Sequence, residues 1–236
     1  MPVYWIVAMC GRYALWGIDL LGVRFLIVDP SIGFRSHFNI GPGTENPAIV
    51  SSSNGNHIMK MTWGLVPSWA KDPKNAPKPI NARSESLAEK PAFKDLLLRK
   101  RCIIPANGFF EWKTVHTKKE PYFVSLKERD LFGFAGLFDT WTGPAGTMTT
   151  YTIVTTEANK TVARYHSRMP VILRKEFEDS WVSSSPLAAG ELNMIFTPYP
   201  EEELIACAVS SAVNSTVAEG EDLVHPISAQ SMLTGK

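Results

Sequence analysis

Between residues 101 and 155, short apolar runs alternate with turn-forming residues, and this pattern constrains the fold most strongly. Residues 101–113 have the pattern of a buried strand, a turn and a returning strand. Further apolar runs follow at 122–126, 133–139 and 151–155. Short strands at such spacing are typical of antiparallel sheets. We therefore predict an α+β fold: a single domain with a mostly antiparallel, barrel-like β core and flanking helices.

The remaining segments add one hairpin and several helices to this prediction. Two apolar runs around the turn formers at 53–56 indicate a hairpin over 48–63. Ser84 is expected to cap a helix that leads into the basic residues before 101. Further helices are predicted over 157–165, 174–181 and near 187–192, and a last strand over about 205–213. These elements complete an α+β pattern.

No internal repeat or composition break divides the chain into separate domains. The expected boundaries are an N-terminal extension over residues 1–8, absent from the mature protein, a domain over 9–225 and a short tail over 226–236. A chain of 236 residues can bury a large core.

Charge and cysteine content restrict the function classes. Lys and Arg number 24 against 23 Asp and Glu, so any basic surface for nucleic acid must be local. The three cysteines form no CxxC pair, and no histidine cluster has metal-ligand spacing. We expect reduced thiols, no metal and no cofactor. No segment reaches the roughly 18–20 apolar residues of a membrane helix, so a soluble intracellular protein is expected.

Cys10, in the segment Met-Cys-Gly-Arg-Tyr at 9–13, is the first candidate for chemistry. If the chain were initiated at Met9 and that methionine removed, Cys10 would carry a free α-amine beside its thiol. Such an aminothiol attacks an aldehyde: the amine forms a Schiff base, and the thiolate closes a thiazolidine ring. The alternative is that Cys10 is a small buried apolar residue on a first strand.

Three polar residues are open to both a chemical and a structural interpretation. Glu111 lies between aromatic residues, where burial would raise its pKa and make it a general acid, or it faces solvent on the strand. His166 follows a predicted helix and is either a proton shuttle or a solvated helix end. Asn81 either caps a helix or positions a reacting group.

The stretch at 64–80 holds four prolines and predicts a long ordered loop of the kind that carries function. Aromatic rings and cations are concentrated beside it, and such pairs bind single-stranded nucleic acid by stacking and phosphate contact. Alternatively, these aromatic residues and cations are ordinary core residues and residues that keep the protein soluble. The residues concerned are Phe38, Trp63, Trp69 and Trp112, with Arg12, Arg83, Arg168 and the loop lysines.

Six segments, in order, resemble the SRAP domain family, the SOS response-associated peptidases, whose members sense abasic sites in single-stranded DNA. The resemblance covers roughly residues 9 to 215. The segments are MCGRY at 9–13, FNIGPGT at 38–44, WGLVPSW at 63–69, INARSE at 80–85, RCIIPANGFFEWK at 101–113 and YHSRMP at 165–170.

The resemblance implies a role for each candidate residue. Cys10, as the mature N-terminus, would attack the ring-opened aldehyde of an abasic site and form a thiazolidine crosslink. Asn81 would orient the aminothiol and the sugar. Glu111 would assist ring opening and proton transfer, and His166 would move protons during Schiff-base formation and reversal. Autopeptidase and lyase-like activities are also implied for this family.

The resemblance further implies which residues contact DNA. Arg12, Arg83 and Arg168 fall where the family contacts phosphates, and Trp69 lies in the loop that borders the bases. Asn39 belongs to the same DNA-binding set. The expected partner is abasic single-stranded DNA, bound by a monomer located in the cytoplasm with the nucleoid, or in the nucleus of a eukaryote. Membrane association and small-molecule cofactors are not expected.

The residues before Met9 depart from the family pattern, because a retained extension would leave Cys10 with an amide nitrogen. Either the chain is initiated at Met9, which we favour, or the extension is removed by self-cleavage. A thiol peptidase, with Cys10 activated by His166 and Glu111, is the rival hypothesis. A third hypothesis is a DNA-binding module without chemistry.

Overall fold

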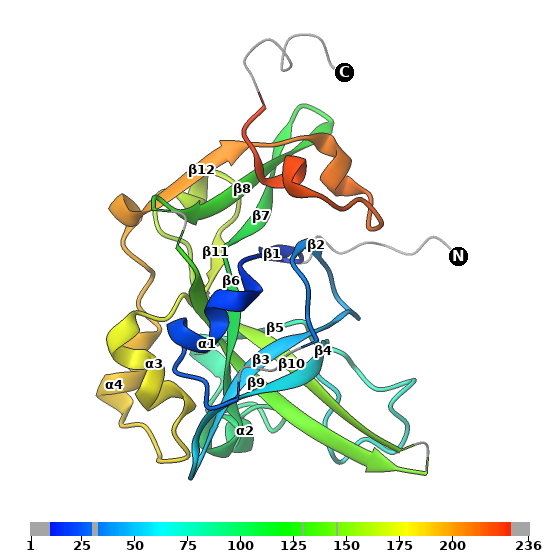
Figure 1. The fold of residues 1–236 in the computed structure, drawn as a ribbon, viewed down its shortest axis with the longest axis vertical. Helices are drawn as coiled ribbons and strands as arrows, with labels where there is room; N and C mark the ends of the chain where they lie inside the picture. Colours follow the sequence, from blue (N-terminus) through cyan, green and yellow to red (C-terminus); the bar gives the residue numbers. More distant parts are fainter. Residues whose placement is uncertain (1–9, 30–32, 129, 145, 228–236) are drawn as a thin grey trace.

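The computed structural model describes residues 10–29, 33–128, 130–144 and 146–227, arranged as two sheets with short helices around them (Figure 1). The predicted extension and most of the predicted tail lie outside these ranges. The predicted α+β class with a mostly antiparallel, barrel-like core is confirmed.

The larger sheet contains a closed barrel. Its ring order is β10, β4, β3, β6, β9 and back to β10, because β10 pairs with both β4 and β9. Every neighbouring pair in the ring is antiparallel except β10 with β4. Two short strands, β5 and β11, also pair with β10. The strands are β3 (Glu45–Ser52), β4 (Gly55–Trp63), β5 (Asn81–Arg83), β6 (Arg101–Ala106), β9 (Phe132–Gly143), β10 (Gly146–Glu157) and β11 (Arg168–Pro170).

The smaller sheet is antiparallel, in the order β12, β8, β7, β1, β2. One of its faces packs on the barrel core, and the other is covered by apolar side chains from the C-terminal segment at 209–224. Both faces of its central strands are therefore buried. The strands are β1 (Tyr13–Leu15), β2 (His37–Ile40), β7 (Gly108–Val115), β8 (Lys118–Leu126) and β12 (Leu204–Ala208).

The helices of the described residues are short and lie at the edges of the sheets (Figure 1). The α-helices are α1 (Leu21–Arg24), α2 (Lys94–Arg99), α3 (Lys175–Val182) and α4 (Ala189–Ile195). The 3-10 turns are η1 (Ile18–Leu20), η2 (Ser84–Ser86), η3 (Val162–Arg164), η4 (Glu201–Glu203), η5 (Ser211–Asn214) and η6 (Glu221–Val224). None of these helices is long and apolar enough to cross a membrane.

Three local predictions are wrong. The helix predicted over 157–165 is replaced by the end of β10 and the turn η3, because pairing with β11 holds Glu157 in the sheet. Ser84 is not a helix cap, since it lies inside η2 and the capping position is Arg83. The strand predicted to reach residue 213 ends at Ala208 and is followed by η5. For the segment 157–165, pairing in the sheet overrides the local preference for a helix.

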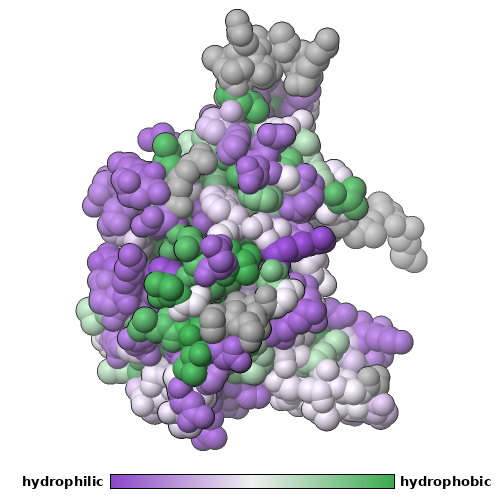
Figure 2. All heavy atoms as spheres, viewed as in Figure 1, coloured by the Kyte–Doolittle hydropathy of each residue, from purple (hydrophilic) through white to green (hydrophobic). Residues whose placement is uncertain are grey.

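Exposed apolar side chains gather around α1, where Figure 2 shows a green cluster. They are Leu20, Val23, Leu26 and Val28. The predicted loop at 64–80 contains no helix or strand, as expected from its prolines.

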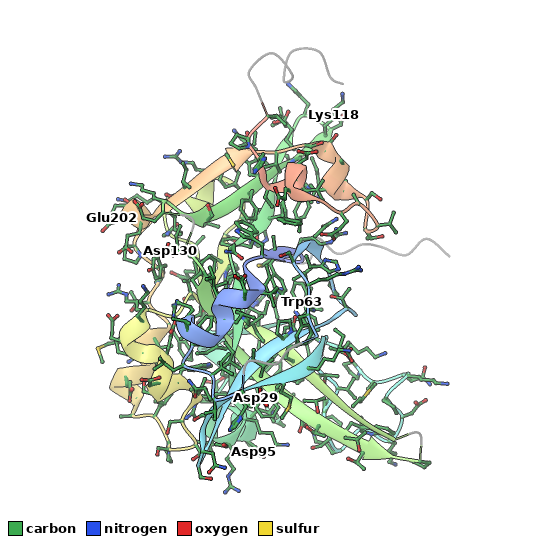
Figure 3. All side chains as sticks on the ribbon, in the orientation of Figure 1. Asp29, Trp63, Asp95, Lys118, Asp130 and Glu202 are labelled. Atoms are coloured by element: carbon green, nitrogen blue, oxygen red, sulfur yellow. The ribbon has the colours of Figure 1, made fainter. Side chains whose placement is uncertain are left out.

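A hydrogen-bonded tyrosine pair lies in the core, beside Trp63, which Figure 3 labels in the interior of the molecule. The hydroxyls of Tyr13 and Tyr151 are 2.8 Å apart, and the side-chain amide of Asn46 donates to Tyr151 Oη at 3.2 Å. The Trp63 and Tyr151 rings stack with centroids 6.2 Å apart. Polar groups of the core are thus paired with one another.

Tyr151→Phe is expected to lower the free energy of unfolding by about 1–3 kcal/mol, because it leaves the Tyr13 hydroxyl and the Asn46 amide buried with fewer partners. Denaturant titration would measure the change. As a control, Tyr199→Phe removes a surface hydroxyl that donates to Glu203 and should change stability by less than about 0.5 kcal/mol. Equal effects of the two substitutions would contradict this account of the core.

Candidate functional site

The centre of the candidate site is a contact between Cys10 and Glu111. The backbone nitrogen of Cys10 donates to Glu111 Oε1 at 3.1 Å. Pairing of β1 with β7, continued by the hydrogen bond from Phe110 N to Arg12 O, brings these two residues together across about 100 positions of sequence. Both are buried, with exposed fractions of 1% for Cys10 and 3% for Glu111. The alternative in which Glu111 faces solvent is excluded.

The strand that carries Glu111, β7, begins with a glycine that lets it lie close to β8. A Cβ atom on Gly108 would lie 2.2 Å from the Phe123 ring and 2.6 Å from the Val124 carbonyl oxygen. Only glycine permits such an approach between neighbouring backbones. Cys10 itself has φ of 39°, a left-handed conformation that is uncommon outside glycine. The chain is therefore sharply turned where it enters the site.

Burial controls the protonation of both residues. Desolvation raises the pKa of Glu111 to about 8, although hydrogen bonds from the backbone of Cys10 and Trp112 act in the opposite direction. Burial also raises the pKa of the Cys10 thiol, and the negative charge of Glu111 adds to this effect. Near neutral pH the carboxyl can therefore hold or release a proton, and the thiol stays protonated.

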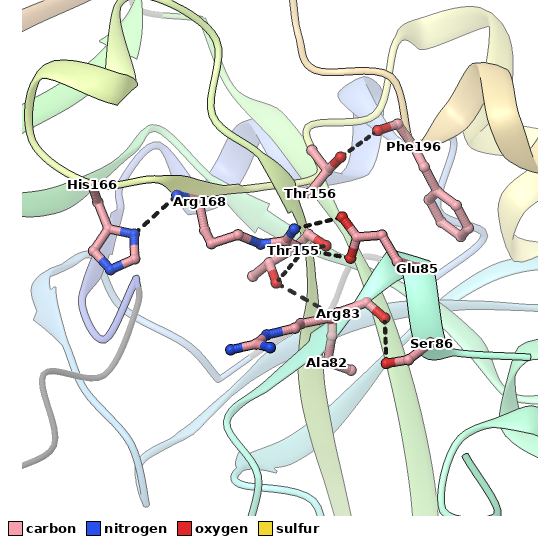
Figure 4. Close-up of polar contacts among 9 residues, drawn as sticks. All are labelled: Ala82, Arg83, Glu85, Ser86, Thr155, Thr156, His166, Arg168 and Phe196. Carbon is pink, nitrogen blue, oxygen red and sulfur yellow. Dashed lines mark hydrogen bonds and ion pairs between the residues drawn. The ribbon is translucent and has the colours of Figure 1, made fainter. Parts of the chain in front are cut away.

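His166 follows η3, and its position is fixed by the backbone (Figure 4). Its Nδ1 accepts a hydrogen bond of 3.0 Å from the backbone nitrogen of Arg168, so a neutral ring carries its proton on Nε2. Burial is the main cause that lowers the pKa of His166, and the charges of Arg168 and Lys119 also lower it. The ring is therefore neutral near neutral pH.

A pair of tyrosines connects the His166 segment with the Glu111 strand. Tyr122 of β8 is the register partner of Glu111, and its ring lies 4.4 Å from the ring of Tyr165, the residue before His166. Asn81, in β5, is half-buried and pairs in register with Ile153 of β10. It is a strand residue, and the position before η2 belongs to Arg83.

The residues predicted to bind DNA form two groups: side chains that hydrogen-bond within the protein, and side chains that are exposed to solvent. Arg12 Nη1 donates to Asn39 Oδ1 at 2.6 Å and to the Val213 carbonyl at 3.2 Å, and burial lowers the pKa of Arg12. Asn39 is buried and donates to the carbonyls of Ser215 and Ala218. These two side chains are thus tied to the C-terminal segment.

Trp69 and Arg83 are exposed instead. Trp69 has an exposed fraction of 68%, although its loop is anchored on both sides. The backbone nitrogen of Ser68 donates to Asp139 Oδ2 at 2.6 Å, and Trp141 Nε1 donates to the Ala70 carbonyl at 2.7 Å. An anchored loop that presents an aromatic face is suited to stacking on a base.

Arg168 is engaged by Glu85, a residue that the sequence analysis names only within a motif. The two side chains form a bidentate ion pair, with distances of 2.5 and 2.8 Å. A separation of 83 positions gives no periodic signal in the sequence. The Tyr122–Tyr165 contact was missed for the same reason.

No group of three or more His, Cys, Asp or Glu side chains that could hold a metal occurs in the part of the chain that the structure describes. Cys102 is fully buried on β6 and belongs to the core.

Comparison with known families places the chain by its sequence. Residues 9–216 match the family described as SOS response associated peptidase (SRAP), and the chain belongs to this family. The resemblance drawn from the six sequence segments is thereby confirmed.

Individual relatives extend the comparison. The chain is 39% identical over 222 residues to the abasic site processing protein YoqW of Bacillus subtilis, covering 92% of this chain and 99% of that protein. It is 33% identical over 227 residues to the abasic site processing protein HMCES of Gallus gallus, covering 82% and 67% of the two chains. A crystal structure of a Bacteroides thetaiotaomicron protein superposes with a TM-score of 0.83 at 26% identity, covering 92% of this chain and 100% of that one.

Proposed function

We propose that this chain is an abasic site processing protein that binds single-stranded DNA and traps abasic sites covalently through Cys10. The observation that carries the proposal is the 3.1 Å contact between the Cys10 nitrogen and the buried Glu111 carboxyl. The names of the relatives, which describe abasic site processing, support the same activity.

The proposed chemistry joins the aminothiol to the ring-opened C1′ aldehyde. The α-amine nitrogen of Cys10 adds to the aldehyde carbon, and loss of water gives an imine. The thiol sulfur then adds to the imine carbon while its proton passes to the nitrogen, which closes the thiazolidine. One water leaves, and no oxidant or reductant is needed.

Glu111 is placed to move the protons of this sequence. As a carboxylate it accepts a proton from the ammonium form of the amine, which makes the nitrogen nucleophilic. As an acid it returns a proton to the hydroxyl that leaves as water. A pKa of about 8, raised by burial, allows both forms near neutral pH. A free ammonium group at this distance would bring that pKa down again, toward the pH of the cell.

This chemistry requires that the mature chain begin at Cys10, so that residues 1–9 are not retained. The domain, predicted over 9–225 of the full sequence, then starts with Cys10 itself. Initiation at Met9 followed by removal of that methionine would supply the free amine, and so would self-cleavage. A chain that keeps the peptide bond before Cys10 has no nucleophilic nitrogen there.

The DNA-binding part of the proposal rests on a local surface, since the whole chain is nearly neutral. Trp69 and Arg83 are exposed and available to a base and a phosphate. Asn81 and His166 complete the proposed catalytic set beside β10. Binding should weaken with added salt, because each Arg–phosphate contact releases counterions.

The thiol peptidase alternative is less well supported by the geometry. A peptidase needs a thiolate nucleophile, whereas burial and the charge of Glu111 raise the pKa of the Cys10 thiol. In addition, the Glu111 carboxylate contacts the nitrogen of Cys10, where an amine would react.

The test is the intact mass of two forms of the protein, one beginning at Cys10 and one retaining residues 1–9. Each is incubated with a single-stranded oligonucleotide in which a uracil base has been removed enzymatically. We expect only the form that begins at Cys10 to gain the oligonucleotide mass less one water. Adduct formation by both forms equally, or by neither, would overturn the proposal.

A further inference from the structure

The Arg168 side chain reaches across β10 to Glu85. At Thr155, β10 pairs with Arg83 of β5 and with Pro170 of β11, so these strands flank it on opposite edges. Arg168 begins β11, and its guanidinium donates to both carboxylate oxygens of Glu85, which follows β5. One of its nitrogens also donates to the Thr155 carbonyl at 2.7 Å. Figure 4 shows this bridge over β10.

The same arginine contacts the His166 ring through its backbone. Its backbone nitrogen donates to His166 Nδ1 at 3.0 Å, which leaves the Nε2 proton of the neutral ring pointing away from this contact. The strand that carries the Arg168 guanidinium, β11, therefore begins at the same residue whose backbone contacts the ring. Glu85, Arg168 and His166 form one connected series from the end of β5 to the imidazole (Figure 4).

We infer that Glu85 is a positioning residue, which acts through Arg168 to hold the His166 ring in one orientation and tautomer relative to β5. The inference rests on the proposed function, in which His166 and Asn81 of β5 serve the same reaction. A guanidinium paired with a carboxylate through two parallel hydrogen bonds is held in one plane, which a single contact would not achieve. Sub-ångström placement of this kind affects rates strongly.

The charge balance of the pair supports a positioning role for Glu85. Glu85 already occupies both terminal nitrogens of the guanidinium, and the Arg168 side chain is only 13% exposed. The hydrogen bonds from Arg168 lower the pKa of Glu85, so the carboxylate stays ionised at neutral pH. Arg83, which is exposed, is better placed to contact a phosphate.

Glu85 can be changed without loss of the fold. Its side chain is 51% exposed, and solvent screens an ion pair at such a position. A variant at this position is therefore expected to fold, and its effect on the reaction can be separated from its effect on stability. Glu89, an exposed carboxylate four positions after Glu85, provides a control of the same charge.

The experiment compares Glu85→Gln with Glu89→Gln in the chain that begins at Cys10. We expect Glu85→Gln to slow adduct formation at saturating abasic DNA about tenfold, with unchanged affinity for undamaged single-stranded DNA. The ¹⁵N chemical shifts of the His166 ring should move from a single Nε2–H tautomer toward an average of the two tautomers. Glu89→Gln should change neither the rate of adduct formation nor the ring shifts.

A second pair of variants tests whether Glu85 acts through the arginine. If it does, Glu85→Gln combined with Arg168→Lys should be no slower than Arg168→Lys alone. Wild-type rate and ring shifts in Glu85→Gln would overturn the inference. So would an increased DNA affinity at an unchanged rate, which would instead mark Arg168 as a masked phosphate-binding residue.

These outcomes are distinguishable from failure of the proposed function. The ring shifts are measured on the free protein and report the coupling of Glu85 to His166 without DNA. Absence of adduct in the wild type would overturn the proposed function, and with it the catalytic significance of that coupling.

Discussion

Cys10→Ser, in a chain that begins at residue 10, is expected to reduce the stable DNA adduct to background. The free amine of the substituted N-terminal residue still forms a Schiff base with the aldehyde, but a hydroxyl adds to the imine much less readily than a thiol does. The imine then hydrolyses. Gel separation of protein and oligonucleotide would show no adduct under ordinary conditions, and borohydride reduction would trap one.

The matched control is Cys207→Ser. Cys207 is a half-buried thiol on β12, and its replacement should leave the adduct intact. A stable adduct with Cys10→Ser would show that the thiol does not close a ring. Absence of any product that borohydride traps would show that the amine does not react, and the non-catalytic DNA-binding hypothesis would then be favoured.

Glu111→Gln is expected to slow adduct formation about 100-fold or more, which is the usual contribution of a positioned general acid or base. The amide keeps the shape of the side chain and can still accept a hydrogen bond from the Cys10 nitrogen, but it cannot take up or release a proton. Single-turnover rates at saturating abasic DNA, between pH 5 and 9, would measure the loss. Glu120→Gln, at an exposed position of β8, should react at the wild-type rate.

Measuring the stability of Glu111→Gln tests the protonation of Glu111 independently of the reaction with DNA. In the chain that retains its peptide bond before Cys10, the pKa of Glu111 is raised to about 8, against about 4.3 in an unfolded chain. Between these values the folded state binds the additional proton, so the free energy of unfolding of the wild type falls as pH rises through this window.

Glu111→Gln lacks this titration, and its stability should therefore change less between pH 5 and 8. Each unit of pKa difference corresponds to about 1.4 kcal/mol, so the wild type should lose a few kcal/mol relative to the variant. Denaturant titrations at the two pH values would measure the difference. A parallel pH dependence of both proteins would show that Glu111 is ionised in the folded state.

The sequence predicted the parts of the site that depend on local patterns. The prolines of the loop at 64–80 excluded regular structure there, and the apolar runs on both sides of Asn107 predicted β6 and β7 correctly. Glu111 remained open because strand alternation does not show whether the face of the sheet that carries it is buried. Glu111 lies on the same face of β7 as Phe109, which packs in the barrel core. Its partner there, the backbone of Cys10, is about 100 positions away in sequence.

Contacts between residues far apart in sequence could not be predicted for the same reason, because local patterns carry no information about the distant partner. Barrel closure depends on a parallel pairing between Thr62 and Thr150, and neither residue carries a signal for the other. The helix predicted over 157–165 was wrong because β11 competes for the backbone of β10. The ion pair of Arg168 with Glu85 could not be inferred from spacing either.

Burial of Cys10 limits which reactive compounds in a cell can modify it. A free aminothiol in water condenses with sugars and other soluble aldehydes and is readily oxidised. In the fold the thiol is almost inaccessible and its pKa is raised, so the reactive thiolate is scarce. A competing electrophile must first gain access to this buried side chain. Selectivity for one aldehyde among many can thus arise from access, without any change in the intrinsic reactivity of the nucleophile.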